Sequence, residues 1–158
     1  MNPFMKIAND LAAENLATHV GGPFGAVVVK DGVVVGQGSN HVIAWHDPTA
    51  HAEVTAIRNA CENLNTHDLS GCVLYTSCYP CPMCLSAIIW ANIRTVYYGN
   101  TKEDAEAIGF RDDMIYRYIS SLAGGKEEPD TLELHPMDRQ ETIETFRQYT
   151  EQEDKTVY

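Results

Sequence analysis

The sequence predicts an α/β fold with a mixed sheet of five strands flanked by helices. Apolar residues at helical spacing open the chain, and Asp31-Gly32 joins two β-branched runs in the manner of a two-residue hairpin turn. Strand-like and helix-like segments then alternate. With 158 residues, 44% of them hydrophobic, the chain is long enough to bury a core, so we expect a single domain over 1–158.

Each element has its own local signal. Helices are indicated by apolar residues every three or four positions, and strands by short apolar or β-branched runs. These signals predict, in order, a helix over 4–16 that stops at Gly21-Gly22-Pro23, strands over 26–30 and 33–36, a helix opened by Asp47-Pro48-Thr49, a strand over 72–77, a helix from Pro82 with Leu85, Ile88 and Ile89 facing inward, and a strand over 94–99.

The last third of the chain reads as a helical region followed by a tail. It is predicted to contain a helical region over 102–122 interrupted around Gly109, a flexible connector over 124–129, a short edge strand over 132–135, and a last helix whose start has Asp138 and Glu141 as a capping box. That last helix has an apolar face behind a flexible linker, which a lone surface helix would not need. We therefore expect a homodimer in which the tail, about 126–158, docks on a partner subunit or on its own body.

Charge and cysteine content narrow the function. The formal net charge is −11 and no cluster of Lys or Arg occurs, so a nucleic-acid partner is disfavoured. No basic start followed by an apolar run marks a signal peptide, and no apolar stretch is long enough to span a membrane. The five cysteines are an odd number, which argues against a disulfide framework. The expected compartment is the cytoplasm.

Two short motifs carry the chemistry. His51-Ala52-Glu53 is followed about thirty positions later by Pro80-Cys81-Pro82-Met83-Cys84, which together supply one imidazole and two thiols. Zinc prefers four tetrahedral ligands, and catalytic sites leave one position for water. No further Cys or His pair stands at a spacing that would close the site. His51, Cys81 and Cys84 are therefore predicted to hold one Zn²⁺ per subunit, and Glu53 to move protons for the water.

Two other readings of the cysteine pair stay open. A lone Cys-x-x-Cys could belong to a structural zinc site completed from elsewhere, or to a redox dithiol at a helix start. The His-x-Glu motif upstream favours the catalytic reading, because a dithiol has no use for it. Cys61 and Cys72 are expected to be core residues, and Cys78 to be a neighbour of the metal loop rather than a ligand.

The motifs also resemble those of a known family. The pattern His-x-Glu with Pro-Cys-x-x-Cys is similar to the signature of the zinc deaminases. Four longer runs, the Gly-Phe-x-Asp segment at 109–112 and the terminal Tyr158 resemble bacterial guanine deaminases over nearly the whole chain; the runs are 22–26, 47–58, 75–78 and 80–85. This resemblance implies the three-layer α/β/α fold of the cytidine deaminases, and hydrolysis of guanine to xanthine and ammonia.

The resemblance further implies a set of residues that bind a small purine base. Phe24 and Trp90 would sandwich the ring, Asn40 and the backbone of Ala52 would hydrogen-bond to it, Asp112 would accept from its N–H groups, and Tyr158 would close the pocket. Asp113 is the neighbouring possibility for Asp112. Guanosine, cytosine, a triazine or the adenosine of a tRNA remain alternative substrates, and a non-enzymatic zinc-stabilised module is the alternative to an enzyme.

Overall fold

The computed structural model describes residues 1–126 and 128–158, and the chain forms two compact units. The first unit is Met1–Asp112 and the second is Asp113–Tyr158. Residue 127, which belongs to the predicted connector, lies outside the described residues. A single domain over 1–158 stays a prediction.

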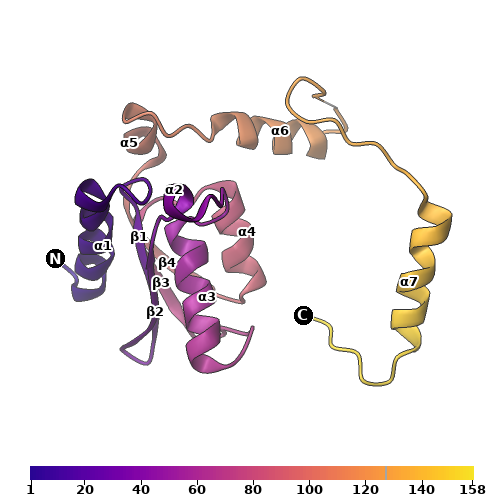
Figure 1. The fold of residues 1–158 in the computed structure, drawn as a ribbon, viewed down its shortest axis with the longest axis horizontal. Coiled ribbons are helices and arrows are strands. Elements are labelled where there is room, and N and C mark those ends of the chain that lie inside the picture. The colour runs from indigo at the N-terminus through magenta and orange to yellow at the C-terminus, as the bar shows by residue number, and fades with distance from the viewer. Residues whose placement is uncertain (127) are drawn as a thin grey trace. The chain divides into compact units, whose positions relative to one another are not determined.

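The first unit contains a mixed sheet of four strands in the order β2-β1-β3-β4 (Figure 1). The strands are β1 (Gly25–Lys30), β2 (Val33–Ser39), β3 (Val73–Cys78) and β4 (Thr95–Asn100). Strand β1 runs antiparallel to β2 and β3, whereas β3 and β4 are parallel. The prediction of a mixed sheet is confirmed.

The predicted fifth strand is wrong. Residues 132–135 form no strand in the structure. Leu132 and Leu134 alternate with polar residues, which is the pattern of an edge strand, but both are largely exposed. Alternation describes only which residues share a face, and a strand also needs a neighbouring strand to which its backbone can bond.

Helices cover both faces of the sheet. Figure 1 shows α1 (Pro3–Thr18) on one side, and α3 (Ala52–Leu64) and α4 (Pro82–Trp90) on the other. A Cβ atom on Gly25 would lie 2.1 Å from the carbonyl oxygen of Ala8 in α1, so this glycine lets α1 approach β1 closely. On the opposite face, the core groups strand residues with helix residues: Ala26, Val28, Leu74, Ala52, Ala56, Ala60 and Ile88. The first unit is therefore a three-layer α/β/α arrangement.

The segment before α3 differs from the prediction. Asp47-Pro48-Thr49 does not open the helix, because the Asp47 carboxylate accepts hydrogen bonds from the backbone N–H and the hydroxyl of Thr49 and closes a turn of its own. A short helix that the sequence did not indicate, α2 (Val42–Trp45), precedes this turn. Helix α3 begins only at Ala52, so His51 is its N-cap residue.

The C-terminal half follows one of its local signals and departs from others. The helical region is broken into α5 (Lys102–Ala107) and α6 (Asp113–Ala123), as the glycine at 109 indicated. The predicted capping box at Asp138 is absent: this N-cap of α7 (Arg139–Glu151) has a φ of 50° and its side chain makes no cap hydrogen bond. The structure instead has a capping box between Thr101 and Asp104. Ile89, predicted to face inward, is 72% exposed.

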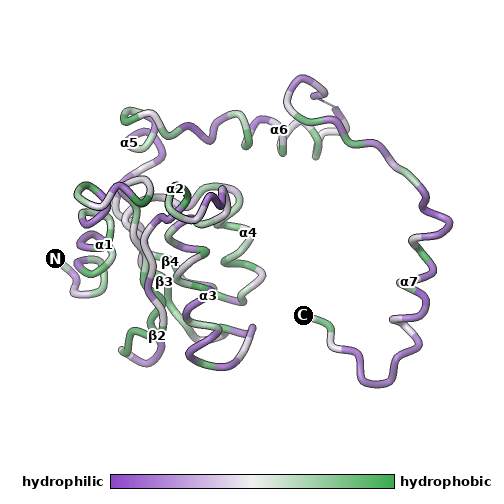
Figure 2. The backbone as a smooth tube through the Cα atoms, in the orientation of Figure 1, coloured by the Kyte–Doolittle hydropathy of each residue, from purple (hydrophilic) through white to green (hydrophobic). Residues whose placement is uncertain are grey.

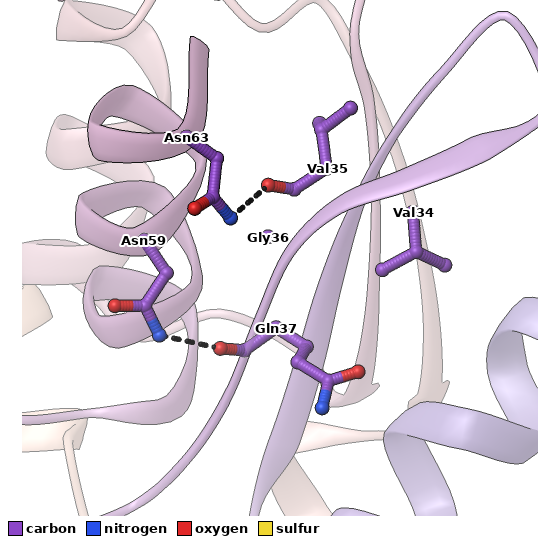
Figure 3. A pocket seen from close by; sticks show the side chains of 6 residues that line it. All are labelled: Val34, Val35, Gly36, Gln37, Asn59 and Asn63. Atoms are coloured by element: carbon purple, nitrogen blue, oxygen red, sulfur yellow. Dashed lines mark hydrogen bonds between the residues drawn. The ribbon is translucent and has the colours of Figure 1, made fainter. Parts of the chain in front are cut away.

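The outer edge of β2 is covered by side chains from α3. Figure 3 shows the hollow between them, where Asn59 and Asn63 each donate a hydrogen bond of 2.8 Å from the side-chain nitrogen to the carbonyl oxygens of Gln37 and Val35. The four residues from Asn59 to Asn63 advance about 6 Å along the helix, close to the advance of two strand residues, so the asparagines match the carbonyls in spacing. This ladder satisfies backbone groups that an edge strand would otherwise leave for another chain.

The second unit consists of α6, α7 and irregular segments. Figure 2 shows that hydrophilic residues dominate α7. On α6, by contrast, Ile115, Ile119 and Leu122 lie at the spacing of one helix face. None of the helices described between 1 and 126 or between 128 and 158 combines the length and hydropathy that a membrane crossing needs.

Candidate metal centre and active site

Two helix starts present the candidate metal ligands. His51 is the N-cap residue of α3 and Cys81 is the N-cap residue of α4, and neither uses its side chain to cap its own helix. Pro82 occupies the first turn of α4, where its missing N–H costs no hydrogen bond. Cys84 lies in the same turn and is fully buried. The side chains of both N-cap residues are therefore available to bind the same metal ion.

The three side chains meet at one point. The ligand atoms of His51, Cys81 and Cys84 all lie within 4.8 Å of one another. His51 Nδ1 is 3.5 Å from Cys81 Sγ and 3.6 Å from Cys84 Sγ. A tetrahedral zinc ion with bonds of about 2.3 Å to sulfur and about 2.0 Å to nitrogen would separate such atoms by about 3.5 Å. The spacing and the donor set fit zinc.

The protonation of the thiols points to the same conclusion. A hydrogen bond from Cys84, assisted by His51, lowers the pKa of Cys81 to about 4. The bond to Cys81 in turn raises the pKa of Cys84, with burial adding to the effect, and the bond to Cys81 raises the pKa of His51. Two thiolates this close repel each other, and a cation between them would stabilise both, as metal binding requires.

Glu53 lies beside this group but is not part of it. Its side chain is 6% exposed, and burial raises the pKa of its carboxyl group. Thr76 Oγ1 donates to Glu53 Oε1 over 3.1 Å, and Cys84 Sγ is 3.4 Å from Glu53 Oε2. A carboxyl group that is held beside the ligands without being one of them is suited to carry protons.

Hydrogen bonds fix the orientation of the side-chain amide of Asn40. Asn40 is buried, and its Oδ1 accepts from the backbone N–H groups of Gly22 and Val42. A backbone N–H can only donate, so the carbonyl oxygen of the amide is bound and the NH₂ group is left to donate. Asn15 supports this geometry, since its Nδ2 donates over 2.8 Å to the carbonyl oxygens of both Gly22 and Asn40.

The other predicted base-binding residues lie in different settings. Phe24 packs edge to face against Phe110, with ring centroids 4.9 Å apart. Ala52 is fully buried as the first residue of α3, where its N–H has no partner within the helix. Asp112, which follows α5 in the sequence and precedes α6, is partly buried, and the neighbouring Asp113 is exposed.

The structure does not place two of the predicted base-binding residues, Trp90 and Tyr158, beside the metal group. Trp90 ends α4, six residues and about 9 Å along the helix axis beyond Cys84, and is 66% exposed. Tyr158 is exposed and belongs to the second unit. Their roles around a bound ring stay predictions.

The remaining cysteines are not ligands in this arrangement. Cys72 is in the core and Cys61 packs against it, as expected. Cys78 is buried, its thiol donates to the carbonyl oxygen of Thr101, and burial together with the Glu53 charge raises its pKa to about 11. Sequence reasoning missed Thr76 and Asn15, both buried polar residues whose partners are distant in the sequence.

Comparison with known proteins extends this picture. The family described as the cytidine and deoxycytidylate deaminase zinc-binding region matches residues 1–100, which include the three candidate ligands and Glu53. Guanine deaminase of Bacillus subtilis is 44% identical over 155 residues, covering 98% of this chain and 97% of that protein. Its X-ray structure matches with a TM-score of 0.91 at 43% identity, over 100% of this chain and 99% of that one.

Two further relatives match less of the chain. A tRNA-specific adenosine deaminase of Aquifex aeolicus is 45% identical, but over only 48% of this chain and 50% of its own length. A crystal structure in complex with 2,6-diaminopurine matches with a TM-score of 0.66 at 38% identity, over 69% of this chain and 61% of that one. From the family match, the donor set and a full-length relative in B. subtilis, the chain belongs to the zinc-binding cytidine and deoxycytidylate deaminase family.

Proposed function

We propose that this protein is a zinc-dependent hydrolase that deaminates guanine to xanthine and ammonia. The observation that carries the chemistry is the carboxyl group of Glu53 held beside a His-Cys-Cys group that fits zinc. The full-length similarity to a guanine deaminase supports the choice of base. The complex of a similar protein with 2,6-diaminopurine supports a free purine rather than a polynucleotide.

The proposed reaction adds water to the carbon that bears the amino group. When bound, zinc lowers the pKa of a coordinated water to about 7. Glu53 takes one proton from the attacking water and gives it to the adjacent ring nitrogen. It then carries a second proton to the amino group, which leaves as ammonia while the new C–O bond becomes a carbonyl.

We propose that the base is oriented by groups around this centre. The free NH₂ group of Asn40 suits an acceptor on the purine, and Asp112 suits its N–H donors. Phe24 offers a ring face, and the N–H of Ala52 at the start of α3 offers a further donor. Trp90 and Tyr158 would complete the enclosure. A carboxylate that pairs with N–H groups discriminates guanine from adenine, whose edge differs.

Ammonia release tests the proposed function. The purified zinc-loaded protein is incubated with guanine, adenine, cytosine, their nucleosides and a tRNA. We expect release from guanine in preference to the others. Release only from tRNA would favour an RNA-editing enzyme, against the net charge of −11. No release from any of them would favour a non-enzymatic zinc module.

Asp112→Ala tests the recognition of the base. We expect kcat/KM for guanine to fall about tenfold or more, because a base N–H would lose its acceptor in a desolvated site. Asp113→Ala is the matched control, since it removes the neighbouring carboxylate. A loss confined to Asp113→Ala would move the role to that residue. Unchanged kinetics in both variants, and after removal of Tyr158, would contradict the proposed roles of Asp112 and Tyr158 in binding the base.

Gly21→Ala tests whether Asn40 is positioned by its surroundings. A Cβ atom on Gly21 would lie 2.2 Å from Oδ1 and 2.3 Å from the main-chain oxygen of Asn40, so Asn40 must move. We expect KM for guanine to rise about tenfold through the weakened hydrogen bond, with zinc content unchanged. Gly124→Ala, where a Cβ atom meets nothing closer than 3.4 Å, is the control. An unaltered KM would remove Asn40 from base binding.

We further propose a homodimer. Ile115, Ile119 and Leu122 form an apolar stripe on α6 that is 38% to 50% exposed in a single chain. Stripes of this kind pack against another surface in folded proteins, so a second copy or the chain's own body would cover it. Light scattering at micromolar concentration is expected to give twice the mass of one chain. A monomer would exclude the dimer.

A further inference from the structure

Thr76 connects strand β3 to the candidate catalytic carboxyl group. Its side chain is 1% exposed, and its hydroxyl lies 3.1 Å from Glu53 Oε1 and 3.2 Å from the carbonyl oxygen of Cys78. A hydroxyl has one proton to donate. Two acceptors therefore compete for it, and one of them belongs to the residue that moves protons in the proposed function.

The two oxygens of Glu53 have different neighbours. Oε1 faces Thr76, whereas Oε2 faces the sulfur of Cys84. As a zinc ligand, Cys84 is a thiolate and has no proton to donate. Oε2 then lies beside the ligands without a hydrogen bond from Cys84, while Oε1 keeps its bond to Thr76.

We propose that Thr76 is a positioning residue that holds Glu53 by Oε1 and leaves Oε2 as the oxygen that accepts and delivers protons. This inference rests on the proposed function. Oε1 is bound to Thr76 on the side of β3, so Oε2, 3.4 Å from Cys84 Sγ, is the oxygen that faces the metal ligands. With the proton on Oε2, Oε1 is still an acceptor, and the bond to Thr76 persists through the cycle.

The backbone of β3 makes Thr76 suited to this role. A β-branched side chain is restricted about its first torsion, so the hydroxyl stays directed at α3. Thr76 lies in the strand that pairs with both β1 and β4, which keeps its backbone in place. The tether is thus rigid at the strand and directional at the carboxylate, as a proton-transfer geometry requires.

Thr76→Val and Thr76→Ser separate the hydroxyl from the shape of the side chain. We expect Thr76→Val to lower kcat for guanine about tenfold to a hundredfold, which is the usual worth of a hydrogen bond to a charged group, with KM and zinc content near those of the wild type. Thr76→Ser keeps the hydroxyl and is expected to retain kcat within about fivefold. Ser77→Ala, which removes the buried hydroxyl that accepts from the N–H of Gly25, controls for lost stability alone.

A double variant gives a readout that a merely structural residue would not share. If Thr76 acts through Glu53, adding Thr76→Val to Glu53→Gln lowers kcat no further. A kcat for Thr76→Val within twofold of wild type, a loss of zinc, or an additive loss in the double variant would overturn the inference. The comparison uses whichever base the wild type deaminates fastest. A wild type inactive on every base would overturn the proposed function and this inference with it.

Discussion

Glu53→Gln is expected to lower turnover by about 10²- to 10⁴-fold while leaving zinc bound, because an amide of the same shape cannot accept and deliver the proton. His51, Cys81 and Cys84 are untouched by the change, so the metal content should equal that of the wild type. The measurement combines metal analysis with ammonia release from guanine on the same preparation. Both kcat and kcat/KM should fall together, as they do when an interaction specific to the transition state is removed.

A second glutamate on the same helix provides the control. Glu62 also lies on α3, but it is exposed and makes none of the contacts of Glu53. Glu62→Gln is expected to keep wild-type kinetics. Near-normal activity of Glu53→Gln would exclude Glu53 as the proton carrier. Loss of zinc from that variant would instead identify it as a ligand.

The metal group is the part of the site that the sequence reveals most directly. His51 and Glu53 are two residues apart, and Cys81 and Cys84 three apart, so each motif is local. Each motif also lies at a helix start, and at the cysteine motif Pro82 indicates that start. The tetrahedral donor set then requires the two motifs to meet, and in the structure their ligand atoms do so.

The parts that the sequence missed depend on contacts between distant segments. Thr76 reaches Glu53 across 23 positions, and Asn15 reaches Asn40 across 25. No local pattern indicates which buried polar side chain will meet which partner. A buried polar residue in an apolar strand is a signal that some partner exists, since such groups are rarely left without one.

The errors in the fold have the same origin. The alternation of residues 132–135 is that of a strand, yet no neighbouring strand pairs with them in the structure. Asp138 has the sequence of a capping residue, but a φ of 50° turns its backbone out of the capping geometry. Asp47 also has the sequence of a capping residue, but its carboxylate accepts a hydrogen bond from Thr49 instead. The local sequence allows each of these segments to adopt the predicted structure. Whether a segment does so depends on the hydrogen-bond partners and backbone angles that it has in the folded chain.

Cys84→Ser is expected to abolish both zinc binding and turnover. Cys84 is fully buried, so a serine hydroxyl in its place would have to lose a proton in a desolvated site to bind zinc as the thiolate does. The remaining pair, His51 and Cys81, is fewer than the three protein ligands of catalytic zinc sites. Stability should also fall, since zinc at a hundred times its dissociation constant contributes about 2.7 kcal/mol to the wild type.

Cys78→Ser is the matched control for that variant. Cys78 is buried close to the same loop, and a serine there can still donate to the carbonyl oxygen of Thr101. We expect it to keep zinc and activity. Metal content, melting temperature and ammonia release are measured for both variants, and for the wild type after chelation and after zinc is restored. Recovery by the wild type but not by Cys84→Ser would assign the metal to this cysteine.

The same experiment separates a metal site from a redox dithiol. A chelator removes zinc without oxidising thiols, whereas a dithiol responds to oxidant and reductant and is indifferent to the chelator. If the wild type keeps its activity and melting temperature in chelator but loses activity on mild oxidation in the absence of metal, Cys81 and Cys84 act as a redox pair. The imidazole of His51 argues against that outcome, because its Nδ1 lies within 3.6 Å of both sulfurs, where a third zinc ligand belongs.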